Sequence, residues 1–366
     1  MRNGTPRVAI AHEWLVRYAG SERCVHELLN AFPGARLITT VAEPEQLPPA
    51  FGVAETSWLQ HVPGATSHHE WLVPLMPVVW RSRSAVSDVD AVISSNHACA
   101  KAVRVEDGIP HVCYCHTPMR YAWAYDDEAE RFPRPLRKPL RHGMRGMRRW
   151  DRRVAANVDR FVANSTAVAA RIKRFYGRSA SVVHPPVDTE YFTPNGAERE
   201  DFFIYVGRLV PYKRPDAVVS AFARLAHRLV VVGEGPLRAS LEAAATPNVS
   251  FVGDVELDEL RELYRRSRAL LHVGVEDFGI AMAEAQACGT PVIGLTTGGA
   301  CDIVVDGETG YLVADNEPAS VADAVEKLAG RDFDREAIRR NGERFSAPRF
   351  RREMSAVVSD CMEHAR

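Results

Sequence analysis

Short runs of apolar, largely β-branched residues alternate with longer helical stretches along the whole chain, and this alternation restricts the fold more than any other feature. Most neighbouring runs leave room for a crossover helix, which is the pattern of parallel sheets with helices on both faces. The sequence therefore predicts the α/β class. The expected strands are 7–12, 37–41, 91–96, 111–117, 160–165, 181–184, 202–206, 228–233, 249–253, 269–275, 291–295 and 311–313.

The alternation is interrupted once, by PPVDTEYFTPNGAERE at 185–200, which is rich in proline and in polar and charged residues. Such a composition favours a boundary between domains. A chain of 366 residues is also too long for one compact core. We therefore expect two doubly wound domains, 1–186 and 201–345, joined by a linker at 187–200. Apolar residues at helical spacing predict a C-terminal helix at about 346–366, packing back on the first domain.

Composition excludes several classes of protein. Lys and Arg total 46 against 47 Asp and Glu, so the charge gives no reason to expect a nucleic-acid partner. The longest apolar stretch, 71–80, contains Pro74 and Pro77 and is too short to span a bilayer, which takes about 20 residues. No long apolar segment precedes the first strand, and the seven cysteines are scattered. We expect a cytoplasmic protein without a signal peptide.

The segment Arg131–Arg153 departs from this neutral average, because it holds ten Lys and Arg against one acidic residue, Asp151. Apolar residues recur within it at helical steps: Leu136, Leu140, Met144, Met147 and Trp150. A basic amphipathic helix suits the anionic inner surface of a membrane. It equally suits a solvated helix whose apolar stripe packs on its own domain, and both interpretations stay open.

The block YVGRLVPYKRPDAVVSAF, residues 205–222, carries two cations on a strand-to-helix loop. The strand ends at Gly207, the loop holds Arg208 and Lys213, and Pro215 begins a helix. Cations beside a helix N-terminus, at the carboxyl end of a strand, are suited to a diphosphate.

A second block, VEDFGIAMAEAQACGTPVIG at 275–294, places seven residues between Glu276 and Glu284. Gly279 permits a tight turn into a helix that runs to about 288. Glu284, one turn into that helix, can accept hydrogen bonds from a vicinal diol such as a ribose, and Glu276 from hydroxyls of a second sugar. The alternative is that Glu284 lies on an exposed helix face.

Together the blocks resemble the retaining glycosyltransferases of family 4, whose GT-B fold has two Rossmann-like domains facing across a cleft. The segments that resemble the donor half are VGRLVPYKR, EDFGIAMAEAQACGTPVI and GGACDIVVDGETGYLV; those that resemble the acceptor half are HEWLVRYAGSERCV, YCHTPMRYAW, DRFVANS and HPPVDTEYF. The chain is most similar in appearance to bacterial mannosyltransferase-like enzymes of lipopolysaccharide or exopolysaccharide assembly.

The resemblance implies a role for each matched residue. Arg208 and Lys213 bind the donor diphosphate, Glu276 contacts the donor sugar and Glu284 the ribose. The expected donor site comprises Gly20, Gly207, Arg208, Lys213, Glu276, Phe278, Gly279, Ile280 and Glu284. The expected catalytic residues are His116, Glu276, Arg208 and Lys213.

In the acceptor half, His116 matches the family histidine near the donor sugar, and His12, Glu13 and Trp14 are the candidates for the acceptor pocket. The family has two adjacent glycines where this chain has Ala19 and Gly20. An alanine forced to positive φ would be strained by about 1 kcal/mol, so we expect this loop either to take another conformation or to need only Gly20.

The implied reaction moves a hexose from a nucleotide sugar to a hydroxyl of a glycan, glycolipid or other acceptor with retention of configuration, the leaving phosphate assisting deprotonation. GDP-mannose is the first expected donor, and a UDP- or dTDP-sugar is the alternative. No Asp-x-Asp motif follows a strand in a metal-binding context, so we expect no metal or other cofactor. Other hypotheses are a nucleotide-sugar epimerase, which needs more acid–base groups than His116, and a non-catalytic carbohydrate-binding protein, which would not need these charges.

Overall fold

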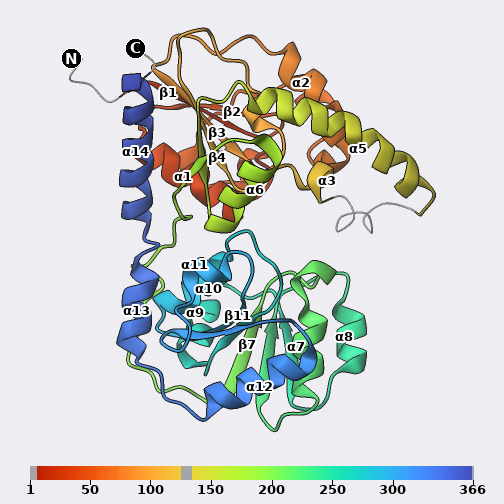
Figure 1. Ribbon diagram of the computed structural model, residues 1–366, viewed down its shortest axis with the longest axis vertical. Helices are drawn as coiled ribbons and strands as arrows, with labels where there is room; N and C mark the ends of the chain where they lie inside the picture. The colour runs from red at the N-terminus through yellow and green to blue at the C-terminus, as the bar shows by residue number, and fades with distance from the viewer. Residues whose placement is uncertain (1–5, 125–133, 365–366) are drawn as a thin grey trace. The chain divides into compact units, whose positions relative to one another are not determined.

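The computed structural model describes residues 6–124 and 134–364. The chain divides into two compact units: unit 1 is Met1–Pro186 with Pro348–Arg366, and unit 2 is Val187–Ala347. Each unit contains a six-stranded parallel sheet with helices on both faces (Figure 1). All twelve expected strands are present, most within a residue or two of the expected bounds. The expected fold class, two doubly wound α/β sheets, is confirmed.

The unit 1 sheet has the strand order β2-β1-β3-β4-β5-β6. Its strands are β1 (Val8–His12), β2 (Arg36–Ile38), β3 (Ala91–Asn96), β4 (His111–Cys115), β5 (Arg160–Ala163) and β6 (Ala180–Val182). Side chains of a strand alternate between two faces. In β1, Val8 and Ile10 enter one apolar cluster and Ala9 and Ala11 another. Both faces are buried, which explains the nearly continuous apolar runs in the sequence.

The helices of unit 1 cover those two faces. They are α1 (Gly20–Ala31), α2 (Met76–Ser82), α3 (Arg120–Trp123), α5 (Arg134–Ala155), α6 (Thr166–Tyr176) and α14 (Ala347–His364), with short 3-10 helices that include η4 (His69–Leu75) and η5 (Ala100–Ala102). The terminal helix α14 runs along unit 1 in Figure 1 and buries Phe350, Met354 and Val358 in the cluster that contains Val8 and Ile10.

The unit 2 sheet has the order β12-β11-β10-β7-β8-β9. Its strands are β7 (Phe202–Val206), β8 (Arg228–Val232), β9 (Val249–Gly253), β10 (Leu270–His272), β11 (Val292–Leu295) and β12 (Gly310–Val313). Its helices are η7 (Pro211–Lys213), α7 (Pro215–Phe222), α8 (Arg238–Ala244), α9 (Leu257–Arg266), α10 (Ile280–Ala287), α11 (Ala300–Ile303), α12 (Pro318–Ala329) and α13 (Arg335–Glu343). Phe203 and Tyr205 pack on one face of β7, and Phe202 and Ile204 on the other.

The expected linker, 187–200, lies within unit 2. Val187 pairs with Ser346 in an isolated β-bridge, and Val187 and Phe192 are buried in one cluster with Ile204. The polar composition identified the point where the units divide. It did not reveal that the apolar residues between the prolines attach this stretch to the core of unit 2.

Helix α5 contains the basic segment, of which residues 131–133 lie outside the described residues, as do the side chains of Leu136 and Leu140. Met147 is buried, and Met144 and Trp150 pack partly buried against the same unit 1 cluster. In this part of the helix the apolar stripe is therefore internal packing. The residues that the structure describes include no helix with the length and apolar character needed to cross a membrane.

Asp151, the acidic residue of the basic segment, fastens α5 to unit 1. Its Oδ1 lies 2.5 Å from Nζ of Lys101 in η5, and both side chains are fully buried. Its Oδ2 accepts hydrogen bonds from Trp123 Nε1 and the Tyr176 hydroxyl, each at 2.7 Å. A buried carboxylate is tolerated only when it is paired and hydrogen-bonded, and Asp151 meets both conditions.

We predict that Lys101→Met destabilises the protein by about 3–5 kcal/mol, because it leaves the buried Asp151 carboxylate without its counter-charge. Arg160→Gln is the matched control, since Arg160 pairs with Asp360 at a partly exposed site. That variant should cost less than about 1 kcal/mol. Urea unfolding measures both, and equal losses in the two variants would contradict the anchoring role of Asp151.

Candidate active site

The two central strands of unit 2, β7 and β10, form the point where the winding of the sheet reverses. Strands β8 and β9 follow β7 in one direction, whereas β11 and β12 follow β10 in the other. The loops that leave β7 and β10 therefore diverge to opposite faces and open a crevice at the carboxyl edge, where open α/β sheets bind ligands. Arg208 and Lys213 lie on the first loop and Glu276 on the second.

Lys213 and Glu276 meet at this reversal point. Nζ of Lys213 lies 2.8 Å from Oε1 of Glu276, and Nε2 of His272 lies 3.2 Å from the same oxygen. Burial on its own would raise the pKa of Glu276, but the Lys213 ammonium and the His272 hydrogen bond outweigh it, so the pKa falls well below its usual range. Burial would lower the pKa of Lys213, and Glu276 raises it instead. Both side chains are therefore charged at neutral pH.

Close packing of backbone holds the two loops together. A Cβ at Gly274 would lie 2.6 Å from Cα of Lys213, so the loop after β10 contacts the loop after β7 through a residue without a side chain. On its other side, the carbonyl of Glu276 accepts a 2.9 Å hydrogen bond from the Gly299 N–H. The position of Glu276 is thus fixed by its backbone as well as by its carboxylate.

The remaining predicted donor residues surround this pair. Arg208 is exposed and follows Gly207 directly, and its charge lowers the pKa of Lys213, which places the two cations near each other. Gly279 has φ 95°, a conformation that favours glycine, and it begins α10 without any side-chain cap. The first N–H groups of α10 therefore meet no capping side chain. Ile280 begins the helix, and the Phe278 ring packs edge-on against Phe345 with 5.4 Å between centroids.

Glu284 is buried, with 4% of its surface exposed, so the alternative of an exposed helix face is wrong. The Tyr264 hydroxyl donates a 3.3 Å hydrogen bond to Oε2 of Glu284. Most of the residues of α10 are apolar and buried. Burying a carboxylate among them costs free energy unless the carboxylate is hydrogen-bonded, so Glu284 needs a partner in the protein or in a ligand.

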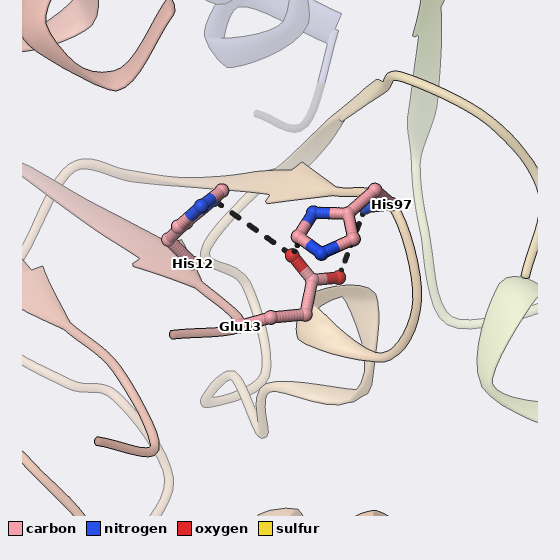
Figure 2. Close-up of side chains that lie close together, drawn as sticks. All are labelled: His12, Glu13 and His97. Carbon is pink, nitrogen blue, oxygen red and sulfur yellow. Dashed lines mark hydrogen bonds and ion pairs between the residues drawn. The ribbon is translucent and has the colours of Figure 1, made fainter. Parts of the chain in front are cut away.

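Unit 1 has a reversal point of the same kind between β1 and β3, because β2 lies on one side of β1 and β4 follows β3 on the other. Glu13 comes directly after β1 and His97 directly after β3. Oε1 of Glu13 accepts four backbone hydrogen bonds of 2.7–3.0 Å, from His97, Ala98, Cys99 and Ala100. Oε2 lies 3.1 Å from Nδ1 of His97 (Figure 2).

His12 lies on the other side of the Glu13 carboxylate in Figure 2. Its Nδ1 is 3.0 Å from the Ser95 carbonyl oxygen, and its Nε2 is 3.3 Å from Oε1 of Glu22. Both of these oxygens only accept, so the two bonds form together when both ring nitrogens carry hydrogen. Burial would raise the pKa of Glu22, but the hydrogen bond and charge of His12 lower it to about 2.

His116 completes this group of polar residues at the carboxyl edge. Its Nε2 lies 2.9 Å from the Ser95 hydroxyl, and its ring is 6.4 Å from that of His97. Burial, and then the neighbouring His97 and His12, lower the pKa of His116 to about 3. His116 is therefore a neutral imidazole at physiological pH, with one donor and one acceptor nitrogen.

The loop before α1 is unstrained. Ala19 has φ −133°, an extended conformation, and its N–H donates a 3.1 Å hydrogen bond to Glu22 in the first turn of α1. Ala19 is therefore not forced to positive φ, and Gly20 is the first residue of the helix. Trp14 is buried and stacks edge-on against His97 with 4.8 Å between centroids.

His12, Glu13 and His97 are the described residues whose ligand atoms come within 4.8 Å of one another, so they are the group that could hold a metal ion. The hydrogen bonds oppose this use. Oε1 of Glu13 already accepts four hydrogen bonds, and Nδ1 of His12 faces a carbonyl that requires a hydrogen on that nitrogen. The group is better suited to holding protons than to ligating a metal.

Sequence analysis named His12, Glu13 and Trp14 but missed His97, Glu22 and Ser95. The position of His97 at the end of the third apolar run was the available signal, because polar residues at the carboxyl ends of adjacent parallel strands come together. That signal required the strand order, which the sequence does not state. Tyr264, which contacts Glu284 from another helix, was missed because helix packing brings the two together. His272 was also missed, although it lies only four residues before Glu276, at the end of β10.

Two family models match the chain, one in each half. Residues 18–191 match the model of Glycosyltransferase Family 4, and residues 187–345 match the model of Glycosyl transferases group 1. A D-inositol 3-phosphate glycosyltransferase of Geodermatophilus obscurus is 35% identical over 230 residues, 54% of this chain and 51% of that protein. One of Catenulispora acidiphila is 34% identical over 46% of this chain and 48% of that protein. The chain thus spans about half the length of the curated relatives it matches.

Solved structures share the fold. Anabaena HepE in complex with UDP and glucose has a TM-score of 0.70 at 16% identity, covering 97% of this chain and all of that chain. A sucrose-phosphate synthase from Thermosynechococcus elongatus has a TM-score of 0.69 at 18% identity, covering 97% of this chain and 98% of that chain. At these identities the likeness concerns the fold alone, which is the expected GT-B fold.

We predict that His111, buried at the start of β4, makes stability fall in acid. Burial lowers its pKa to about 4, while an unfolded histidine titrates near 6.5. The contribution of neutral His111 to the free energy of unfolding is therefore complete above pH 6.5, and it is lost as the pH falls toward 4. Between pH 7 and pH 5 the wild type should lose about 2 kcal/mol more than His111→Gln in urea unfolding. Equal losses would show that His111 is protonated in the folded protein.

Proposed function

Since the chain is built of two glycosyltransferase family domains, one of family 4 and one of group 1, we propose that it is a retaining hexosyltransferase. Unit 2 binds a nucleotide sugar, and unit 1 binds the acceptor whose hydroxyl receives the hexose. The observation that carries this proposal is the Lys213–Glu276 pair at the reversal point of the unit 2 sheet.

The pair accounts for donor binding as follows. Lys213 uses one of its three N–H groups on Oε1 of Glu276, so the others can reach a diphosphate together with exposed Arg208 and the N–H groups of α10. In the part of the chain that the structure describes, no hydrogen bond or ion pair engages Oε2 of Glu276, which can accept from a sugar hydroxyl. Negative charge grows on the β-phosphate as the glycosidic bond breaks, and the fixed cations stabilise it. We propose that these cations serve in place of a metal ion.

The donor and acceptor follow from different arguments. GDP-mannose is the first candidate donor, on the resemblance to mannosyltransferase-like enzymes. A UDP-sugar is the second, favoured by the UDP in structures of HepE. If GDP-mannose is the donor, the candidate acceptor is a lipid-linked glycan. The names of the relatives give D-inositol 3-phosphate as a second candidate acceptor.

The test is a thermal-shift screen of GDP-, UDP-, ADP- and dTDP-sugars with the full chain, because a cognate donor stabilises the fold by mass action. Stabilising donors are then incubated with each acceptor, with and without EDTA, and the anomeric configuration of the product is read by NMR. We expect one base to be selected, with retention and without an effect of EDTA. If no nucleotide sugar raises the melting temperature, the proposed function is wrong.

We predict that Glu284→Gln weakens donor binding by about 1–3 kcal/mol, because a neutral amide is a poorer partner for a ribose diol. That loss is roughly 5- to 150-fold in Kd. Gln keeps an oxygen for the Tyr264 hydroxyl, so the melting temperature of the free protein should barely move. Calorimetric titration with the selected donor measures the change, and Arg224→Gln, an exposed cation on the same unit, is the control. An unchanged Kd would make Glu284 a structural residue.

We also propose that the basic segment Arg131–Arg153 attracts unit 1 to anionic lipid. Lys138, Arg141 and Arg145 on α5 are exposed, whereas the stripe at Met147 is buried, so the attraction is chiefly electrostatic. Each cation contributes up to about 1 kcal/mol near an anionic surface.

We therefore predict co-sedimentation with anionic but not neutral vesicles, decreasing steeply between low and physiological salt. Changing Arg137, Lys138, Arg141 and Arg145 to Glu should abolish co-sedimentation and leave donor affinity unchanged, because these residues lie outside the donor-binding unit. If the wild type does not co-sediment with anionic vesicles at low salt, the proposal is wrong and the segment is a solvated helix.

A further inference from the structure

Arg214 has a backbone conformation that is unusual for its residue type. Its φ is 54° and its ψ is 41°, in the left-handed region, and Asp88 is the other described residue besides glycine with a positive φ. A residue with a Cβ loses free energy in this region. The next residue is Pro215, which disfavours the right-handed helical conformation for Arg214 and makes an extended one usual. The left-handed conformation of Arg214 therefore needs support from the surrounding structure.

The side chain of Arg214 supplies that support through two contacts. Its Nε lies 3.1 Å from both carboxylate oxygens of Asp216, in the first turn of α7. Its Nη1 donates a 2.6 Å hydrogen bond to Oδ1 of Asn316, in the loop between β12 and α12. Asn316 lies 102 residues later in the chain. This bond from a charged donor therefore ties the loop after β7 to a loop that is distant in sequence.

Asn316 extends the connection to the second strand of the reversal point. Its Nδ2 donates a long hydrogen bond of 3.5 Å to the carbonyl oxygen of Val273, the residue directly after β10. Gly274 comes next, and a Cβ on Gly274 would lie 2.6 Å from Cα of Lys213. The contacts therefore close a ring at the carboxyl edge of the unit 2 sheet, made of Lys213, Arg214, Asn316, Val273 and Gly274.

The ring determines where Lys213 lies. Lys213 is the last residue of η7, and Arg214 is both the C-cap of η7 and the N-cap of α7. The backbone angles of Arg214 therefore set how η7 meets α7. If Arg214 took an extended conformation, η7 would turn and carry Lys213 Nζ away from Oε1 of Glu276, from which it now lies 2.8 Å. A displacement of about 1 Å in a group that acts on a substrate can change the rate about 100-fold.

We propose that Arg214 and Asn316 form a clamp that holds the Lys213 ammonium beside Glu276, where it meets the diphosphate of the nucleotide sugar. The inference rests on the proposed function for the identity of the ligand, and it makes Arg214 and Asn316 positioning residues. The clamp acts through the backbone. What matters at position 214 is the left-handed conformation, which the side-chain contacts enforce in this chain and which glycine takes without strain.

The alternative role for Arg214 is to supply charge or packing, and two variants at this position separate the roles. Arg214→Gly removes the charge and the whole side chain but accepts a positive φ. Arg214→Met removes the same charge and keeps an apolar stem, while its Cβ still disfavours a positive φ. If charge or packing is the role, Arg214→Gly is at least as damaging as Arg214→Met. If the clamp is the role, Arg214→Met is the more damaging of the two.

The experiment compares the full-length wild type with Arg214→Met, Arg214→Gly and Asn316→Ala, which opens the ring without changing position 214. The control is Arg224→Gln, an exposed cation of the same unit. Titration calorimetry with UDP and with GDP gives Kd. Release of the nucleoside diphosphate from UDP-glucose and from GDP-mannose gives kcat, with water or D-inositol 3-phosphate as acceptor.

We expect Arg214→Met and Asn316→Ala to lose about 10- to 100-fold in kcat, because Lys213 no longer lies where charge grows on the diphosphate. Arg214→Gly should lose at least about fivefold less than Arg214→Met, since it adopts the left-handed conformation without strain. Arg224→Gln should match the wild type. If Arg214→Gly loses as much as Arg214→Met or more, the clamp is overturned.

A second measurement needs no ligand. The chain has five lysines, so ¹³C spectra of lysine-labelled protein contain few signals, and Lys213→Arg identifies the signal of Lys213. Burial lowers the pKa of Lys213, but the charge of Glu276 raises it above its usual value. We expect the signal to titrate at lower pH in Arg214→Met and Asn316→Ala than in the wild type, and to stay unchanged in Arg214→Gly.

The spectra also separate the clamp from the proposed function. A Lys213 signal that is unchanged in Asn316→Ala would overturn the clamp, even if Arg214→Met failed to fold. A wild type that binds no nucleoside diphosphate would contradict the proposed function, and the spectra would still decide whether Arg214 and Asn316 hold Lys213 beside Glu276.

Discussion

The reversal of winding in each parallel sheet is the constraint on which both sites depend. Where the order reverses, the loops from two adjacent strands diverge, and the strand ends between them are covered by neither helix. In unit 2 this point brings together Lys213 and Glu276, and in unit 1 it brings together His97 and Glu13. In each unit a cationic or titratable group after one central strand meets a carboxylate after the other. The same topology has thus produced two charged sites from unrelated residues.

Burial determines how those charges are held. A carboxylate withdrawn from water must recover its hydrogen bonds, and Glu13 does so with four backbone N–H groups on a single oxygen. Glu276 instead relies on Lys213 and His272, again on a single oxygen. In both cases one carboxylate oxygen fixes the side chain and leaves the other to face a titratable ring or a ligand. Asp151 shows the contrasting case, since both of its oxygens contact protein groups and its role is structural.

Local sequence patterns predicted the elements, because strands, turns and the glycine at 279 are encoded within a few neighbouring positions, and they selected Lys213 and Glu276, which the structure brings together. Except for His272, which lies four residues from Glu276, the residues that were missed are distant in sequence from their partners. His97 lies 84 residues from Glu13, and Tyr264 lies 20 residues from Glu284. Their proximity follows from strand order and helix packing. The stripe on α5 shows the same limit, since amphipathicity marks an apolar face without stating whether a bilayer or the hydrophobic core of unit 1 covers it.

The two sites differ in how firmly their protons are held. In unit 2, mutual attraction lowers the pKa of Glu276 and raises that of Lys213, so both side chains stay charged around neutral pH. In unit 1 the carboxylates are equally fixed, whereas Glu13 raises the pKa of His97 above its usual value and burial keeps His116 neutral. Only an imidazole can change its charge there under physiological conditions. A constant electrostatic field is what the proposed binding of a diphosphate requires. Which side chains the two reversal points bring together therefore determines that unit 2 holds a constant charge and that unit 1 holds an imidazole whose charge can change.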